Sequence, residues 1–256
     1  MALVISYLTP DGPRYGLVDE GIVFEWEGDL LVDRQYNPGH AVGTPESVTL
    51  LPPVRPSKIV CIGRNYAAHA AEHNAAVPDE PIIFLKPPSA LIGPQVAIEF
   101  AHSVGRVDHE AELAVIIGKQ AHKVSRESAL DYVIGYTCAN DVSARDLQKK
   151  DGQWARAKGF DTFCPLGPYV NTDLNPADLG IRCTVNGQLR QDSRTSMLVF
   201  DVPALIAFIS QVMTLLPGDL ILTGTPEGVS QLFDGDVVRV EIEGIGTLEN
   251  PVKVVS

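Results

Sequence analysis

The chain has 256 residues, of which 45% are hydrophobic and 20% are charged, so it can bury a full core and does not have the composition of a disordered protein. Its 32 acidic and 20 basic residues give a formal charge of −12, which argues against a nucleic-acid-binding surface and against a basic membrane-binding patch. Because of this charge, an anionic ligand would need a local cation or a bound metal ion to attract it. No apolar stretch reaches the ~18 residues of a membrane span.

The first residues and the cysteines indicate a cytoplasmic protein. Residues 1–12 lack a basic segment, and Thr9 and Pro10 interrupt their apolar run, so they make a poor signal peptide. The cysteines are widely spaced and form no C-x-x-C pair, which argues against a zinc ribbon or a thioredoxin motif. They are Cys61, Cys138, Cys164 and Cys183. Free thiols in a reducing cytosol fit this spacing best.

Short strands separated by turns are expected at the start of the chain. Residues 3–8, 14–19 and 21–28 have the composition of strands, and Asp11-Gly12 and Glu20-Gly21 separate them, which predicts a small β meander. Residues 33–56 are rich in Pro, Gly and Thr and are typical of a connector. We therefore expect a small N-terminal β subdomain with its connector over residues 1–56 and a catalytic domain over residues 57–256.

The catalytic part begins with alternating strand and helix signals. Residues 58–63 form a short apolar segment that predicts a buried strand, and the alanines of residues 64–76 favour a helix after it. Residues 81–88 predict another apolar strand that two prolines end. Asn186-Gly187, between two strand-like segments, is a strong hairpin signal.

Residues 202–213 predict a helix whose apolar side chains belong to the core. Asp201 precedes this segment and Pro203 lies in its first turn, as at many helix starts. The apolar stripe consists of Leu205, Ile206, Ile209, Val212 and Met213. Strands follow again to the end of the chain, so strands outnumber helices. Since regular βαβ alternation and G-x-G-x-x-G are missing, a Rossmann unit is improbable and the fold class is α+β, rich in strands.

Three carboxylates in this part are candidate metal ligands. Glu110 and Glu112 alternate with apolar residues at 111, 113, 115 and 117, so on a strand both point the same way, roughly 7 Å apart at their Cα atoms. Such a pair repels unless a cation or a proton lies between them. Asp141 follows the apolar run 132–139, where a second buried strand would end. Oxygen ligands alone suit Mg²⁺ or Mn²⁺ better than zinc; the alternative is an exposed strand face with solvated charges.

The segment HAAEH, residues 69–73, allows three interpretations. It matches the H-x-x-E-H pattern, in which two histidines four apart on a helix hold zinc in a peptidase. It also fits a polar face on an alanine-rich helix. Alternatively, His69 and Glu72 share a helix face and form a dyad, in which the carboxylate raises the basicity of the imidazole so that it accepts a proton from water. In that case His73 has no assigned task.

Two further segments have residues suited to an anionic ligand. Lys158 stands among Gly, Phe and Cys residues and could lie near the acids, where its ammonium would hold a carboxylate or an enolate oxygen; the alternative is a surface lysine. Gly224-Thr225-Pro226 follows an apolar strand and could present N–H groups and a hydroxyl to an anion. It is not a phosphate-binding P-loop, because no Gly-Lys-Ser/Thr follows.

Seven motifs in order strongly resemble the fumarylacetoacetate hydrolase family. They are GRNYAAHAAEH, IIFLKP, DHEAELAVIIGK, DYVIGYTCANDVSARD, AKGFDTFCPLGP, VNGQLRQ and LTGTPEGV, and the likeness covers about residues 57–252. The resemblance implies a β-rich mixed roll of that family's type, a homodimer, and Mg²⁺ or Mn²⁺ held by two glutamates and one aspartate. The N-terminal region resembles the short leader of small bacterial members, so a dedicated fumarylacetoacetase is not expected.

Carried over by position, the resemblance implies three groups of site residues. The metal ligands would be Glu110, Glu112 and Asp141. The catalytic residues would be His69 and Glu72, as the family's dyad, with Lys158. The substrate contacts would be Arg64, Asn65, Tyr66, Gln148 and Thr225. One position departs from the pattern, since many members have Asp before the dyad histidine and this chain has Ala68.

The resemblance also implies a reaction. The expected substrate is a small anionic 2-oxo acid, and the expected reaction is Mg²⁺-dependent cleavage of a C–C bond through an enolate, either hydrolysis of an acylpyruvate or decarboxylation of oxaloacetate. A first alternative is isomerisation of 2-hydroxyhepta-2,4-diene-1,7-dioate in aromatic catabolism, because several motifs look equally like those isomerases. A second alternative, from another class, is a non-catalytic module that binds metal and ligand.

Overall fold

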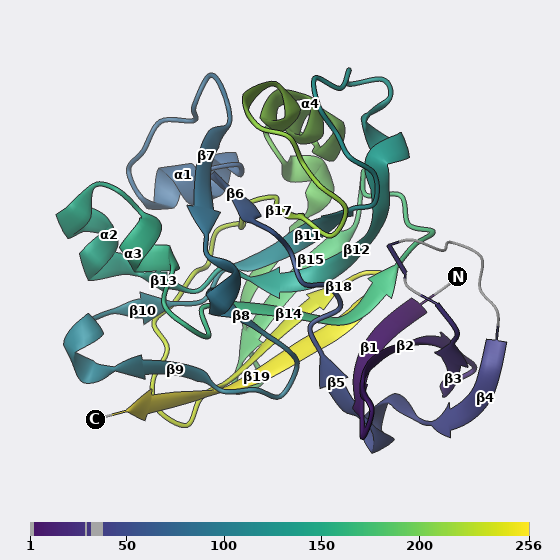
Figure 1. Ribbon diagram of the computed structural model, residues 1–256. Helices are drawn as coiled ribbons and strands as arrows, with labels where there is room; N and C mark the ends of the chain where they lie inside the picture. Colours follow the sequence, from purple (N-terminus) through teal and green to yellow (C-terminus); the bar gives the residue numbers. More distant parts are fainter. Residues whose placement is uncertain (1–2, 29, 32–37, 256) are drawn as a thin grey trace.

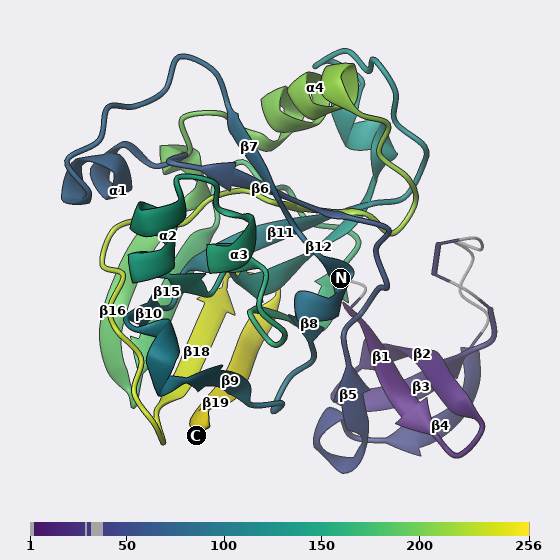
Figure 2. The same ribbon diagram turned by 60° about the vertical axis from the view of Figure 1, so that its left-hand side comes forward.

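The computed structural model describes residues 3–28, 30–31 and 38–255. Its main body consists of strands arranged in three sheets, with short helices on the outside (Figures 1 and 2). The predicted α+β, strand-rich fold with a small N-terminal β unit is confirmed. No described helix is long and apolar enough to cross a membrane. All four cysteines are buried and free, as expected.

The largest sheet runs through both the N-terminal unit and the main body. Its path, in spatial order, is β4 (Pro38–Gly43), β3 (Ile22–Trp26), β2 (Gly12–Asp19), β1 (Leu3–Thr9), β14 (Cys164–Asn171), β12 (Val133–Asn140), β11 (Ala111–Ile117), β17 (Leu220–Leu222), β6 (Ile59–Gly63) and β7 (Ile82–Lys86). Two short strands lie off this path: β5 (Thr49–Leu51) pairs with β1, and β8 (Leu91–Ile92) pairs with β14. The predicted meander is therefore joined to the body through β1 and β14.

The second sheet contains the predicted hairpin. Its strands are β16 (Gln188–Arg194), β15 (Gly180–Val185), β18 (Val237–Ile242), β19 (Gly246–Val255) and β9 (Ile98–Ala101). Asn186 and Gly187 connect β15 to β16 with φ of 52° and 76°, the left-handed conformation that this two-residue turn requires. A third, two-stranded sheet pairs β10 (Val107–Asp108) with β13 (Ser143–Ala144).

The helices are short and lie at the edges of the sheets (Figure 1). The α-helices are α1 (Ala67–Glu72), α2 (Arg145–Asp151), α3 (Ala155–Lys158) and α4 (Val202–Val212). The 3-10 helices are η1 (Pro45–Ser47), η2 (Pro88–Ala90), η3 (His102–Val104), η4 (Ala129–Tyr132) and η5 (Thr195–Met197). The helix predicted over residues 202–213 is present as α4, and Asp201 caps it, since its carboxylate accepts the N–H of Ala204 at 3.0 Å.

Three details of the predicted elements differ from the structure. The helix expected over residues 64–76 covers only Ala67–Glu72, because Arg64 has a left-handed φ of 57° and the segment is extended at Tyr66. The connector expected over residues 33–56 contains β4 and β5, which pair with the meander; residues 33–37 lie outside the described part. Val212, expected in the core, is 61% exposed in the last turn of α4. The proposed boundary at residue 56 stays a prediction.

Strand β11 separates two hydrophobic cores, and this places the acidic residues. Ala111, Leu113, Val115 and Ile117 belong to the larger core, whereas Ala114 and Ile116 on the opposite face belong to the second one. Glu112 shares the face of Ala114 and Ile116. The predicted apolar face is therefore present, but the acidic face is buried as well, so the alternative of an exposed, solvated strand face is wrong.

Ile206 and Val212 on α4 differ in burial, so their substitution should change the stability of the protein to different extents. Ile206 is fully buried, so Ile206→Ala should lower the free energy of unfolding by about 2–5 kcal/mol through lost burial and a residual cavity. Val212→Ala, on the same helix, should change it by less than about 0.5 kcal/mol. Urea denaturation followed by circular dichroism would measure both, and equal losses would contradict the assignment of these side chains to core and surface.

Candidate active site

The pairing of two strands brings the three predicted carboxylates together. Strands β11 and β12 are antiparallel, and Ala111 lies opposite Asn140, so the start of one strand meets the end of the other. Glu110 and Asp141 are the residues just outside this pair, and the Asp141 N–H donates to the Glu110 carbonyl at 2.8 Å. With Glu112 they offer ligand oxygens that all lie within 4.8 Å of one another, and none of the three residues is more than 4% exposed.

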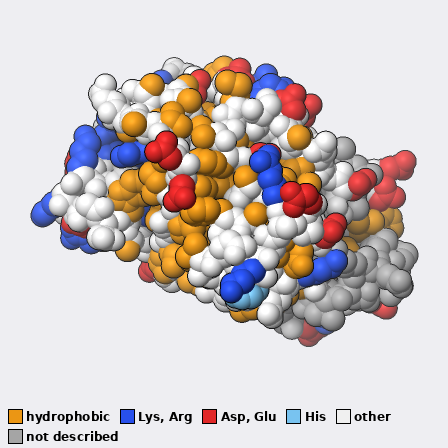
Figure 3. Space-filling view, turned by 90° about the horizontal axis from the view of Figure 1, so that it is seen from above, with side chains coloured by type: hydrophobic (Ala, Val, Ile, Leu, Met, Phe, Trp, Pro, Cys, Tyr) orange, Lys and Arg blue, Asp and Glu red, His pale blue; other side chains and the backbone are white. Residues whose placement is uncertain are grey.

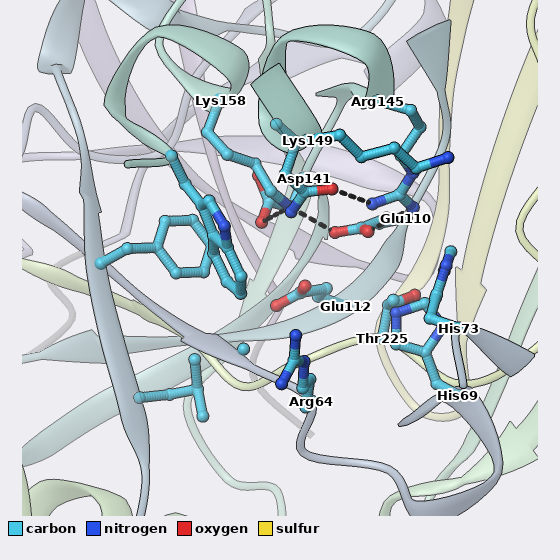
Figure 4. Close-up of a pocket in the computed structure, with 15 residues that line it drawn as sticks. Arg64, His69, His73, Glu110, Glu112, Asp141, Arg145, Lys149, Lys158 and Thr225 are labelled. Carbon is cyan, nitrogen blue, oxygen red and sulfur yellow. Dashed lines mark hydrogen bonds and ion pairs between the residues drawn. The ribbon is translucent and has the colours of Figure 1, made fainter. Parts of the chain in front are cut away.

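Three buried cations surround two of these carboxylates. The Lys158 ammonium lies 2.6 Å from Glu110 Oε2 and 2.6 Å from Asp141 Oδ2, so it bridges them (Figure 4). Lys86 Nζ donates to Asp141 Oδ1 at 2.6 Å, and Arg145 Nη2 donates to Glu110 Oε1 at 2.6 Å. Burial opposes ionisation of Glu110, but Lys158 and Arg145 outweigh it and lower its pKa. Glu110 is therefore held ionised, and Asp141 lies between two ammonium groups.

Glu112 is the carboxylate of this cluster that has no cationic partner within hydrogen-bonding distance among the described residues. Its Oε2 accepts the Gly224 N–H at 2.7 Å. Burial and the neighbouring charges of Asp141 and Glu110 raise the pKa of Glu112 well above its usual value. The predicted turn at residues 224–226 thus supplies an N–H to a carboxylate of the protein itself. The cluster has one acid whose charge a further cation would compensate, and its donors are all oxygens, which fits Mg²⁺ or Mn²⁺.

The predicted dyad forms at the C-terminal end of α1. His69 Nδ1 lies 3.3 Å from Glu72 Oε2, three residues along the helix. The other carboxylate oxygen of Glu72 accepts the Gly228 N–H at 3.2 Å, which ties the helix to the loop after β17. Burial lowers the pKa of His69, so its imidazole is neutral near pH 7 and can accept a proton.

The other interpretations of HAAEH fare differently. His69 is only 6% exposed, so it does not belong to a solvated polar face. His69, Glu72 and His73 do form a second group with ligand atoms within 4.8 Å of one another. However, α1 ends at Glu72, so His73 lies just outside the helix on which the zinc pattern would place both histidines. The His73 ring stands edge-on to the His69 ring, with their centroids 4.7 Å apart.

A pocket of about 250 Å³ brings most of the predicted residues together (Figure 4). The predicted residues that line it are Arg64, His69, Glu110, Glu112, Asp141, Gln148, Lys158 and Thr225. The residues that line it without having been predicted are Ile62, Gly63, His73, Phe84, Arg145, Lys149 and Trp154. Glu72 lines an adjoining hollow with Arg106 and Asp108. The pocket therefore has an acidic centre and basic side chains at its rim.

Asn65 and Tyr66, for which substrate contacts are expected, are not among the residues that line this pocket, and their contact with substrate stays a prediction. The Asn65 amide is fully buried, donates to the carbonyls of Phe200 and Thr223 at 2.9 and 2.7 Å, and accepts the Phe200 N–H at 2.8 Å. Tyr66 is 1% exposed. Arg64, the residue before Asn65, has a left-handed φ of 57° and itself lines the pocket. Asn65 therefore holds backbone segments together.

Sequence reasoning missed Lys86 and Arg145. Lys86 ends the apolar strand β7, and its ammonium is 0% exposed. Arg145 begins α2 and also donates to Asp108 at 2.9 Å, a carboxylate that Arg106 holds as well. A lysine at the end of an apolar strand could have suggested a buried charge; Arg145, within a run of charged residues, had no comparable signal.

Comparisons with known proteins show the family of the chain. Residues 58–253 match the family described as fumarylacetoacetate (FAA) hydrolase C-terminal, and residues 4–53 match the family described as Rv2993c-like, N-terminal. The mitochondrial oxaloacetate tautomerase fahd2 of Xenopus laevis is 51% identical over 219 residues, which cover 80% of this chain and 69% of that protein.

Two solved structures show the same fold. The 2-hydroxyhepta-2,4-diene-1,7-dioate isomerase of Mycobacterium marinum is 45% identical with a TM-score of 0.90 over 99% of both chains. The fumarylpyruvate hydrolase of Pseudomonas aeruginosa, solved with Mn²⁺ and pyruvate, is 33% identical with a TM-score of 0.74 over 80% of this chain and 91% of that one. Because the family match spans nearly all of the main body, the chain belongs to the fumarylacetoacetate hydrolase family.

Proposed function

We propose that the protein is a Mg²⁺- or Mn²⁺-dependent enzyme that cleaves a C–C bond of a small 2-oxo acid, by hydrolysis of an acylpyruvate or decarboxylation of oxaloacetate. The observation that carries the proposal is Glu112, a buried carboxylate without a cationic partner among the described residues, in the same pocket as the neutral base His69. A metal ion and a base in one small pocket are the two elements that enolate chemistry requires.

Glu110, Glu112 and Asp141 would hold the ion. When bound, it supplies Lewis-acid polarisation of the carboxylate and keto oxygens of a 2-oxo acid. The fumarylpyruvate hydrolase of Pseudomonas aeruginosa, which was solved with Mn²⁺ and pyruvate, supports this choice of ion and of ligand chemistry. The His69, Glu72 and His73 group is not the site that we propose, because the dyad contact already uses His69 Nδ1 and one Glu72 oxygen.

The rim of the pocket suits a substrate with a negative charge. Arg64 is exposed, lines the pocket, and forms no ion pair with any residue that the structure describes. Lys149 and Gln148 lie on the other side, on α2. In a protein with a formal charge of −12, these side chains would provide the local attraction that an anionic substrate needs.

The chain's own residues would then move the proton and stabilise the charge. His69 would accept a proton from the water that attacks the distal carbonyl, while Glu72 keeps the imidazole oriented. Burial opposes protonation of Lys158, but Asp141 and Glu110 raise its pKa, so it stays an ammonium. A fixed positive charge there would stabilise the negative charge that develops on the enolate oxygen when the C–C bond breaks.

A second candidate is isomerisation or tautomerisation by the same site. If His69 moves a proton along the carbon chain and no water attacks, a 2-hydroxy-dienoate becomes its 2-oxo form. The names of the Mycobacterium marinum isomerase and the Xenopus laevis tautomerase favour this candidate. A module that binds metal and ligand without turnover is the alternative from another class.

We also propose a homodimer in the cytoplasm. Exposed hydrophobic side chains on and near β7 and α4 support self-association, among them Val77, Leu85 and Val212, which are 43–61% exposed. Figure 3, which looks down on the end of the molecule that carries these elements, shows hydrophobic side chains gathered across the middle of that face. Patches of this kind commonly mark protein contacts.

An absorbance assay tests the reaction directly. Metal-stripped protein would be mixed with acetylpyruvate, oxaloacetate or 2-hydroxyhepta-2,4-diene-1,7-dioate, each with and without Mg²⁺. We expect Mg²⁺-dependent loss of acetylpyruvate or oxaloacetate with pyruvate as a product. Isomerisation of the dienoate alone would favour the second candidate. No absorbance change with any of the three compounds would contradict enolate chemistry on these substrates.

His69 should be required for turnover, and its ionisation should shape the pH profile. His69→Ala should lower kcat by about 10²–10⁴-fold, the usual contribution of a general base. In the native protein, kcat/KM should fall as the pH drops through an apparent pKa below 6.5, because the neutral imidazole is the active form and burial lowers its pKa.

Two matched variants serve as controls for His69. His102→Ala, at an exposed position, should leave the rate and the acid limb unchanged. His73→Ala tests the zinc-peptidase interpretation, in which both histidines are ligands; we expect it to retain Mg²⁺-dependent turnover. Full activity of His69→Ala would remove the dyad from the mechanism.

The gain in stability that Mg²⁺ gives the protein should depend on the Glu112 carboxylate. In the native protein, Mg²⁺ at 100 times its Kd should stabilise the fold by about 2.7 kcal/mol, measured as a rise in Tm. Glu112→Gln keeps an oxygen for the Gly224 N–H but loses the charge, so this rise should largely disappear. Glu241→Gln, on an exposed position of β18, is the control and should keep it. A full Mg²⁺-dependent rise in Glu112→Gln would mean that the ion binds elsewhere.

A further inference from the structure

A buried glutamine behind the pocket joins the two large sheets. Gln191 lies on β16 and is 0% exposed. Its Oε1 accepts the Ala111 N–H and faces His109 Nδ1, each at 3.0 Å. Its Nε2 donates to Thr225 Oγ1 and to the Pro226 carbonyl, each at 2.8 Å. The amide therefore uses all of its usual hydrogen-bonding positions, and it contacts both the strand of the acidic cluster and the turn that contains Thr225.

Backbone groups fix the orientation of this amide. The Ala111 N–H can only donate and the Pro226 carbonyl can only accept, so the oxygen and the nitrogen of Gln191 cannot be exchanged. His109 agrees with this assignment. Its Nε2 accepts the Ser230 N–H at 3.2 Å, so the ring hydrogen is on Nδ1, where Gln191 Oε1 and the nearby sulfur of Cys183 can accept it.

The amide in turn fixes the hydroxyl of Thr225. This hydroxyl donates its only hydrogen to the Ala111 carbonyl at 2.8 Å and accepts one hydrogen from Gln191 Nε2. One lone pair therefore remains, and Thr225 is among the residues that line the pocket (Figure 4). To donate to a ligand, the hydroxyl would have to leave the Ala111 carbonyl without this partner in a buried site, which costs free energy.

We propose that Gln191 is a positioning residue that makes Thr225 a hydrogen-bond acceptor toward the ligand, so that the site selects ligands with a hydroxyl or enol hydrogen at this point. This inference rests on the proposed function, since it concerns the ligand of the same pocket. An enol or a 2-hydroxy acid donates to the free lone pair of Thr225. A carboxylate or ketone oxygen at the same place would meet a second lone pair and be disfavoured.

The selection can be measured with two small ligands of similar size. Glycolate carries a hydroxyl hydrogen and oxalate at pH 7 carries none, while both can chelate Mg²⁺. Isothermal titration in saturating Mg²⁺ would compare the native protein with Thr225→Val, Thr225→Ser and Gln191→Met. Gln188→Met is the matched control, because Gln188 is exposed on the same strand.

We expect glycolate to bind about tenfold more weakly to Thr225→Val and to Gln191→Met, with less than a twofold change for oxalate. Thr225→Ser and Gln188→Met should bind both ligands as the native protein does. A merely structural role for Gln191 would weaken both ligands together. Should Gln191→Met fail to fold, Thr225→Val still decides the question.

The possible failures are distinguishable. Equal losses for glycolate and oxalate, or native glycolate affinity in Thr225→Val, would overturn the inference about Gln191 and Thr225 alone. If the native protein bound neither ligand in Mg²⁺, the proposed metal-dependent chemistry of 2-oxo acids would be overturned, and this inference with it.

Discussion

The structure depends on the burial of three carboxylates within a few ångströms of one another. Like charges at this distance in a protein interior are strongly unfavourable unless cations compensate them. The protein meets this requirement with Lys86, Lys158 and Arg145, which come from three different elements. The compensation covers Glu110 and Asp141 but not Glu112. Several elements are thus arranged around one electrostatic requirement, and Glu112, which none of these three cations contacts, is the carboxylate that a divalent ion would compensate.

The same centre explains why the surrounding loops have fixed conformations. The turn after β17 donates the Gly224 N–H to Glu112, and Gly224 has a φ of 102° with Asn65 packed against it: a Cβ there would stand 2.7 Å from that of Asn65. Four residues on, the Gly228 N–H binds Glu72 of the dyad. A single loop therefore contacts both the acidic cluster and the Glu72 carboxylate that is paired with His69, so their relative positions are coupled through its backbone.

Features that depend on local spacing could be predicted from the sequence. Glu110 and Glu112 share a face because strand side chains alternate, and His69 meets Glu72 because residues three apart on a helix are neighbours. The hairpin at Asn186-Gly187 and the cap at Asp201 are equally local. Asp141 was predicted because an apolar strand ends before it.

Features that depend on the folding of distant segments could not be predicted. Lys86 lies 55 residues from its partner Asp141, and Gln191 lies 80 residues from Ala111. The place of Lys86 at the end of an apolar strand can suggest a buried charge, but nothing local to either residue identifies its partner. Asn65 shows a different limit: its motif is recognisable, but its amide is used by the carbonyls of Phe200 and Thr223, which are distant in the sequence.

The most direct test of the central claim is an anomalous difference map from a crystal of the protein grown with Mn²⁺. We predict one strong peak about 2.0–2.3 Å from oxygens of Glu110, Glu112 and Asp141. A peak at His69, Glu72 and His73 with none at the three carboxylates would contradict the account, because the buried acids would then have a purely structural role.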